Sequence, residues 1–226
     1  MMEWQEVEAI EWLEARLPGA RVAFTTRSAG SMKDSHWLFA DALRFAQKRI
    51  VTGRQVHGAK LAFHDVATAE TPAVDGHVMR QPGPIGLVYT ADCLPVAVAG
   101  PGGVAMLHCG WRGLAAGIAA RGAEAVGGAT HAAIGPGIGP CCYEVGDEVL
   151  AEFSALGDGV ANGRLLDLTE VAKRLLLQAG VETIETEPIC TRCKPELFFS
   201  HRRDGTPHRQ AGLAWLEGPG EPRCPA

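Results

Sequence analysis

Apolar residues in the middle of the chain form three short and almost uninterrupted runs, at residues 85–90, 94–99 and 103–108. Runs of this length, bounded by polar or glycine-rich turns, are typical of buried strands. The pattern therefore predicts three consecutive strands, joined by a turn around Asp92 and by the Gly-Pro-Gly-Gly sequence at 100–103.

Apolar residues at helical spacing predict helices on both sides of these strands. Near the N-terminus, Trp4, Val7, Leu13 and Leu17 follow such a spacing, which predicts an N-terminal helix within residues 1–20. Further helices are expected at 34–50, at 113–126, at 144–156 and from Leu168 to Gly180, where Asp167 and Glu170 resemble a capping box. Further strands are expected at 21–26, 131–135, 183–190, 196–201 and 211–216, followed by a loose tail at 217–226.

Predicted helices and strands alternate irregularly, and paired strands are close in sequence. This order favours an α+β fold with layered, mixed sheets over a regular βαβ repeat. The chain shows neither an internal repeat nor a linker, so residues 1–226 are expected to form a single domain.

Composition and charge exclude several classes of protein. The chain is 46% hydrophobic and 21% charged, with a formal net charge of −5, which is ordinary for a globular protein and argues against nucleic-acid binding. No apolar segment reaches the roughly 18 residues of a membrane span. The N-terminus has neither the basic start nor the apolar centre of a signal peptide, so we expect a cytoplasmic protein. Its seven cysteines are then expected to be thiols or metal ligands.

Three residues at the ends of predicted strands combine the chemistry of a metal site. His57, Cys93 and His108 offer two imidazoles and a thiolate, which suit Zn²⁺ and leave a fourth position open for water. The same residues also allow a metal-free site, in which Cys93 is a nucleophile and His108 its base. The plainer alternative is that both histidines are polar core residues and Cys93 is a small buried hydrophobe.

Cysteines near the C-terminus form a second, weaker pattern. Cys190, Cys193, His201 and His208 have a spacing that superficially resembles a structural zinc site, but the interval between the pairs is short for a zinc finger. Two thiols at the end of a strand are the favoured interpretation.

Adjacent cysteines and their neighbours form a third candidate. Cys141 and Cys142 are expected to serve packing, because adjacent cysteines rarely bind one metal together. Tyr143 and Glu144, which follow them, are candidates for contacts with a polar ligand.

Arginines next to glycine or at a helix start are candidates for binding phosphate or carboxylate. They are Arg27, Arg112, Arg202, Arg203 and Arg209. Arg112 precedes the predicted helix at 113, whose first amides would add to an anion site. Any one surface arginine is more often simply solvated. Asp75 and Asp92 are candidate partners of a ligating histidine, the alternative being that each caps a turn.

Several motifs together resemble the laccase-domain (multicopper polyphenol oxidase) family, now described as purine nucleoside phosphorylases with adenosine deaminase activity. They are TTRSAGS, RQVHG, VDGHVM, TADCLPV, LHCGWRG, IGPGIGPCCYEVG and CTRC with LFFSHRRDG, and the match runs from about Thr25 to Arg209. The resemblance implies a layered α/β/β/α single domain, similar to the catalytic domain of cytotoxic necrotizing factor toxins. It also implies that His57, Cys93 and His108 bind zinc, with copper as a possible substitute.

The resemblance implies phosphorolysis of adenosine, inosine, guanosine and methylthioadenosine, and deamination of adenosine. Zinc would lower the pKa of a bound water towards about 7, and Arg112 or Arg27 would hold phosphate. The alternatives are a metal-free cysteine hydrolase or amidase, a copper-dependent polyphenol oxidase and a non-catalytic purine-binding module. The eight histidines are mostly isolated, which argues against a multicopper cluster.

Two departures from the family pattern affect regions near the expected pocket. The segment at 31–53 is shorter than usual, and His208 stands where the family has glycine. The sequence does not fix the oligomeric state.

Overall fold

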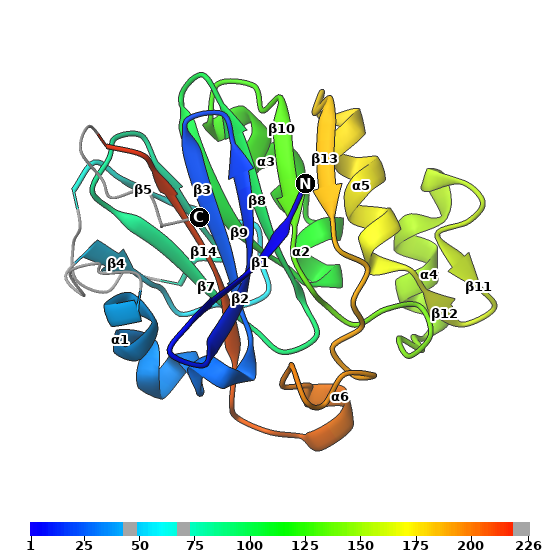
Figure 1. Ribbon diagram of the computed structural model, residues 1–226. Helices are drawn as coiled ribbons and strands as arrows, with labels where there is room; N and C mark the ends of the chain where they lie inside the picture. Colours follow the sequence, from blue (N-terminus) through cyan, green and yellow to red (C-terminus); the bar gives the residue numbers. More distant parts are fainter. Residues whose placement is uncertain (43–48, 67–72, 219–226) are drawn as a thin grey trace.

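Two six-stranded sheets form the middle of the computed structural model, which describes residues 1–42, 49–66 and 73–218 (Figure 1). The first sheet has the order β1 (Glu3–Val7), β2 (Ile10–Leu17), β3 (Ala20–Thr25), β14 (Gln210–Leu216), β7 (Ile85–Thr90) and β4 (Ile50–Val51). The second has the order β13 (Thr183–Thr186), β10 (His131–Ile134), β8 (Leu94–Gly100), β9 (Gly103–Cys109), β6 (Gly76–Met79) and β5 (Leu61–His64). Both sheets are mixed, because β4–β7, β5–β6 and β10–β13 are parallel pairs and the others are antiparallel.

Helices cover the outer faces of the two sheets. The helical elements are η1 (Arg27–Ala29), α1 (Met32–Ala42), α2 (Trp111–Ala115), α3 (Ile118–Ala125), α4 (Asp147–Phe153), η3 (Ser154–Leu156), α5 (Leu168–Gln178) and α6 (His201–Asp204). A small hairpin, β11 (Ala161–Asn162) and β12 (Leu165–Leu166), lies beside α4 (Figure 1). None of the helices in the described part of the chain has the length and hydrophobicity that a membrane span requires.

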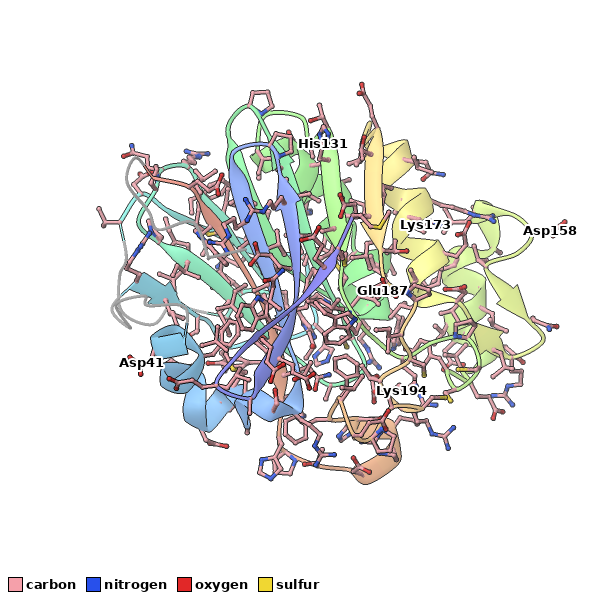
Figure 2. All side chains as sticks on the ribbon, in the orientation of Figure 1. Asp41, His131, Asp158, Lys173, Glu187 and Lys194 are labelled. Carbon is pink, nitrogen blue, oxygen red and sulfur yellow. The ribbon has the colours of Figure 1, made fainter. Side chains whose placement is uncertain are left out.

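Three clusters of buried residues establish the order of the layers. One joins the facing sides of the two sheets and includes Phe24, Val88 and Met106. The second packs α1 against the first sheet around Phe39 and Trp215. The third lies between the second sheet and the helices α2 to α5 and holds most of the apolar residues of that side. Figure 2 shows side chains filling the space between these layers. The predicted α/β/β/α arrangement of mixed sheets is therefore confirmed.

The three central runs form the strands that the sequence predicts, and their register positions two reactive residues. β8 pairs with β9 so that Leu94 lies opposite Cys109 and Pro95 opposite His108. The start of β8 therefore meets the end of β9. Since Cys93 immediately precedes β8, this register places it beside the end of the strand that carries His108.

The prediction of an N-terminal helix within residues 1–20 is wrong. These residues form the hairpin β1–β2, and the turn uses Glu8 and Ala9 with φ of 50° and 66°. Positive φ at two central residues is the geometry of a tight hairpin turn that suits twisted strands. In β2 four consecutive residues, 12–15, are buried. With both faces of the strand covered, the alternation typical of an exposed strand is lost, and the apolar positions fit helical spacing by coincidence.

Other predicted boundaries shift for local reasons. The helix expected at 113–126 is divided into α2 and α3, because Gly117 has a φ of 83°. The strand expected at 196–201 is absent, and the short helix α6 begins there with Ser200 accepting from the Arg203 amide. The capping by Asp167 is confirmed, since its side chain accepts from the Glu170 amide at 2.9 Å. Residues 219–226 of the expected tail and 43–48 of the expected helix lie outside the described residues.

We predict that Glu14→Ala lowers the free energy of unfolding by about 3 kcal/mol, because it leaves a buried arginine without its counter-charge. Glu14 accepts two hydrogen bonds from Arg21, with Nη2–Oε2 at 2.7 Å and Nε–Oε1 at 3.2 Å, and both side chains are buried. Urea unfolding measures the change. The control is Glu6→Ala, an exposed glutamate of β1, for which a change within about 0.5 kcal/mol is expected. Equal effects of the two variants would contradict the prediction.

Candidate active site

His57, Cys93 and His108 come together at one end of the sandwich. His57 lies in the loop between β4 and β5, Cys93 at the start of β8, and His108 in β9. The atoms that could bind a metal all lie within 4.8 Å of one another. The two imidazole rings are 4.8 Å apart between centroids and nearly perpendicular, at 73°. His57 is exposed, Cys93 is half-buried and His108 is buried, so the group is open to solvent on one side.

The buried carboxylate of Asp75 fixes two members of this group. Three successive amides donate to it, those of Val56 (3.1 Å), His57 (2.8 Å) and Gly58 (2.8 Å). Its Oδ1 also lies 2.9 Å from Nδ1 of His108. These hydrogen bonds hold the loop around the carboxylate while His57 adopts a φ of 61°, a conformation that costs free energy in a residue other than glycine.

Asp92 holds the third member through the backbone. It immediately precedes Cys93 and has a φ of 94°. Its Oδ1 accepts from Thr191 Oγ1 and its Oδ2 from the Arg202 amide, both at 2.7 Å. The structure thus pairs Asp92 with Thr191 and Arg202 rather than with a ligating histidine, and Asp75 alone of the two expected aspartates contacts His108.

Charges within the group shift two pKa values in opposite directions. Burial alone would raise the pKa of Cys93, but the charges and hydrogen bonds of His108 and His57 lower it to about 6. Burial opposes protonation of His108, yet the Cys93 thiolate and Asp75 raise its pKa to about 9. Burial likewise disfavours ionised Asp75, but hydrogen bonds from His108 and the loop amides keep its pKa below the usual value. Near neutral pH the group therefore holds an ionised thiol, which is the form that attacks electrophiles and binds metals.

The donor set fits a resident metal ion. Asp75 is ionised and can only accept, so the Nδ1 of His108 carries its proton and Nε2 is left for a metal or for Cys93. A thiolate with two imidazoles suits zinc and also copper. Three donors leave at least one coordination position for water or substrate.

The three residues lie in the wall of a cavity of about 470 Å³, a size typical of small-molecule sites. Basic side chains dominate its polar lining: Lys33, Arg54, Arg202 and Arg209. Tyr89 and Tyr143 add aromatic faces, and Asp92 is the carboxylate in the lining. Burial, followed by the negative charge of Cys93, raises the pKa of Tyr143 to about 12, so its hydroxyl keeps its proton.

The sequence model of the family described as multi-copper polyphenol oxidoreductase laccase matches residues 23–217. The chain belongs to this family. Its relatives include proteins named purine nucleoside phosphorylase. One from Streptomyces coelicolor is 34% identical over an alignment of 229 positions, which covers 95% of this chain and 93% of that protein. Another, from Xylella fastidiosa, is 36% identical over 183 residues, covering 72% of this chain and 70% of the relative.

Solved structures share the fold of this laccase-like family member. The crystal structure of YlmD from Geobacillus stearothermophilus superposes with a TM-score of 0.80 at 29% identity, covering 95% of this chain and 99% of that one. A protein of Neisseria meningitidis gives a TM-score of 0.79 at 27% identity, covering 92% of this chain and 99% of its own.

The arginines expected to bind phosphate are only partly brought to the cavity. Arg202 lines it, with Nη1 donating to the Glu144 carbonyl at 2.9 Å and its guanidinium over Tyr143. Arg112 lies over the Trp111 ring and is not part of the lining. Arg27 is directed away, with Nη1 donating to the Pro195 carbonyl.

Glu144 also misses the cavity. Its exposed side chain lies 3.9 Å from Arg164, and only its carbonyl is used, by Arg202.

Sequence reasoning missed Lys33, Arg54 and Gln55. Gln55 exchanges two hydrogen bonds with the backbone of Tyr89, accepting at 2.7 Å and donating at 2.8 Å, and so joins the His57 loop to β7. Gln55 and Arg54 both belong to the RQVHG motif, and this position could have identified them. No sequence signal identifies Lys33, because only the fold brings α1 to this cavity.

The spacing of Cys190, Cys193, His201 and His208 that superficially resembles a zinc site does not bring these four residues together. Among the described residues, the two cysteines gather with Cys141 and Cys142 instead. His201 lines the cavity, and His208 packs near Phe199 with ring centroids 5.5 Å apart.

We predict that Gly110→Ala disrupts the site without unfolding the protein. A Cβ at this position would lie 2.9 Å from Cys93 Sγ and 3.3 Å from Cδ2 of His57, closer than side chains normally approach. Zinc titration of the metal-free protein should show at least tenfold weaker binding, the lower end of the loss expected when a ligand is misplaced.

The control for this prediction is Gly58→Ala in the same site, where the added Cβ meets only ordinary contacts, with Asp75 Oδ2 at 3.6 Å. Unchanged zinc affinity in Gly110→Ala, or equal losses in both variants, would contradict it.

Proposed function

We propose that this protein is a zinc-dependent purine nucleoside phosphorylase that also deaminates adenosine. The observation that carries the proposal is the convergence of His57, Cys93 and His108 in the wall of a basic cavity of nucleoside size. The names of the relatives from Streptomyces coelicolor and Xylella fastidiosa support the phosphorylase activity. Adenosine, inosine, guanosine and methylthioadenosine are the proposed nucleosides, and phosphate is the second substrate.

The basic lining supports phosphate as a substrate. Among the described residues, the cavity lining contains the cationic groups of Lys33, Arg54, Arg202 and Arg209, against one carboxylate, that of Asp92. Guanidinium groups bind phosphate oxygens in pairs and hold the anion in a fixed orientation. Phosphorolysis requires phosphate on the face of C1′ opposite the base while the glycosidic bond breaks, and orientation supplies much of the catalysis in such a reaction.

Residues around the metal ligands have defined roles in this proposal. Asp75 holds the Nδ1 side of His108, so that Nε2 is directed at the metal position, and it keeps the His57 loop closed around its carboxylate. Tyr143 offers a protonated hydroxyl that donates a hydrogen bond to the base. When bound by His57, Cys93 and His108, zinc would supply Lewis acidity, which deamination of adenine at C6 requires.

A second candidate, a metal-free cysteine hydrolase, is favoured by one observation. The Cys93 thiol has its pKa lowered to about 6, beside a His108 whose pKa is raised to about 9. Such a pair is the activated nucleophile and proton donor that acyl transfer uses. The two candidates differ in whether the activity depends on metal.

We predict that the zinc-loaded protein converts adenosine and phosphate to adenine and ribose 1-phosphate. Without phosphate, we predict that it hydrolyses adenosine to inosine and ammonia. Both activities should be lost after chelation, should return with zinc, and should fall at least a hundredfold in Cys93→Ala, since one metal ligand is removed. Liquid chromatography of the products measures both reactions. The control is Cys109→Ala, a buried cysteine on the opposite face of β9 that belongs to the core beneath α2 and α3.

Two outcomes would contradict this proposal. Activity that depends on Cys93 and persists without metal would favour the hydrolase. Phenol oxidation that requires copper, with no nucleoside turnover, would favour an oxidase.

We predict that Arg54→Ala raises the KM for phosphate about tenfold and leaves deamination of adenosine nearly unchanged. A lost charge-assisted hydrogen bond accounts for about 1.5 kcal/mol, and deamination uses no phosphate. The matched control is Arg112→Ala, whose guanidinium lies over Trp111 outside the cavity lining and whose loss should change neither reaction. Equal losses in both reactions for Arg54→Ala would contradict the prediction, because they would mean that Arg54 binds the nucleoside or stabilises the fold.

A further inference from the structure

A second group of metal-binding side chains lies outside the candidate active site. Cys141 and Cys142 belong to the loop between β10 and α4, and Cys190 and Cys193 to the segment between β13 and α6. Their four sulfur atoms all lie within 4.8 Å of one another. All four are free thiols, and Cys193 Sγ is 3.3 Å from that of Cys142 and 3.6 Å from that of Cys141. We propose that these four cysteines bind one zinc ion as a closed structural site.

The spacing of the sulfur atoms suits tetrahedral zinc. A Zn–S distance of about 2.3 Å places the sulfurs of a tetrahedral site about 3.8 Å apart. The separations of Cys193 Sγ from Cys141 Sγ (3.6 Å) and from Cys142 Sγ (3.3 Å) are slightly shorter than this value, and all four sulfurs lie within 4.8 Å of one another, so binding requires only small adjustments. Both adjacent cysteines take part because the chain turns tightly before them, with the amides of Cys142 and Tyr143 donating to the Gly139 carbonyl at 3.0 and 3.1 Å.

Backbone amides already surround one of the sulfurs as they would surround a thiolate ligand. The Gly139 amide donates to Cys190 Sγ at 3.2 Å, and the amides of Arg192 and Cys193 are also directed at this sulfur. Hydrogen bonds of this kind orient a ligand and stabilise its negative charge. The C-x2-C turn is closed by the Cys193 amide, which donates to the Cys190 carbonyl at 3.2 Å.

Positive charge is available to balance four thiolates and one zinc ion, which together carry two negative charges. Arg192 and Lys194 flank Cys193, and both are exposed. Lys194, labelled in Figure 2, lies on the segment just above α6 in that view. Arg203, whose Nη2 also pairs with Asp204 at 2.7 Å, donates from Nη1 to the carbonyls of Thr191 (2.9 Å) and Arg192 (3.0 Å). Cationic neighbours lower the cost of gathering thiolates.

A metal at this site would join a segment that lines the cavity to one that supports it from behind. Tyr143, which lines the cavity, directly follows Cys142. Thr191, between Cys190 and Cys193, donates to Asp92, which directly precedes Cys93. With four protein ligands the site has no open position, so its role is to hold these segments and not to react.

The test is the zinc content of the full-length chain, loaded with zinc in reducing buffer and freed of excess metal. We expect about two zinc ions per chain in the wild type, about one in Cys93→Ala, about one in Cys193→Ala, and none when both changes are combined. Cys109→Ala is the matched thiol control and should keep two. This count does not depend on catalysis, so a chain that binds two zinc ions but turns over no nucleoside would contradict only the proposed function.

A second measurement uses the wild type alone and so does not depend on the variants folding. Alkylation followed by mass spectrometry should show Cys141, Cys142, Cys190 and Cys193 reacting at least tenfold more slowly with zinc present than after chelation. The proposal is overturned if the wild type holds a single zinc that Cys93→Ala removes while these four thiols react equally with and without zinc. It is also overturned if Cys142 and Cys193 form a disulfide under conditions in which Cys93 and its partners bind zinc.

Discussion

The buried carboxylate of Asp75 is the interaction on which the candidate site depends. Isolated in the interior, such a charge would be costly, but three loop amides and the imidazole of His108 surround it with donors. The same residue joins β9 through its backbone, since its carbonyl accepts from the His108 amide at 2.7 Å. One side chain thereby sets the position of a loop residue, His57, and of a strand residue, His108. It also fixes the tautomer in which His108 can bind a metal.

Cys93, the third member of the group, is positioned by the topology of the sandwich. β7 belongs to the first sheet and β8 to the second, so the chain crosses between the sheets at residues 91–93. Cys93 lies at this crossing, where neither sheet supplies regular partners for the backbone. The Asp92 side chain holds this crossing in place by accepting from Thr191 and the Arg202 amide. Gly110 leaves the space that the Cys93 sulfur occupies. The cavity opens at the end of the sandwich because the crossing leaves room there.

Local sequence patterns predicted those parts of the fold in which the pattern of buried and exposed positions along the chain follows from the element itself. The strands β7, β8 and β9 and the cap of α5 each depend on a short segment, so a local sequence pattern is enough to predict them. The hairpin β1–β2 was missed because β2 is covered on both faces, which hides the alternation of a strand. The grouping of His57, Cys93 and His108 could be inferred from the chemistry of these residues and from the family motifs. The basic lining of the cavity could not be inferred. Arg27 and Arg112 are held by Pro195 and Trp111 instead, while α1 brings Lys33 to the cavity from a distant part of the chain.

The four-cysteine group and the group of His57, Cys93 and His108 are connected through a short path of direct contacts. The turn that carries Cys190 and Cys193 contains Thr191, which holds Asp92 and so the backbone of Cys93. The segments 136–146 and 187–200 contain no regular strand or helix, but they lie side by side, since the Thr191 amide donates to the Gly137 carbonyl at 2.9 Å. A metal that joins them would restrict the motion of Thr191 and Tyr143 together, at little cost to the core. The proposed structural zinc therefore offers a physical reason why an otherwise irregular part of this fold can position reactive groups.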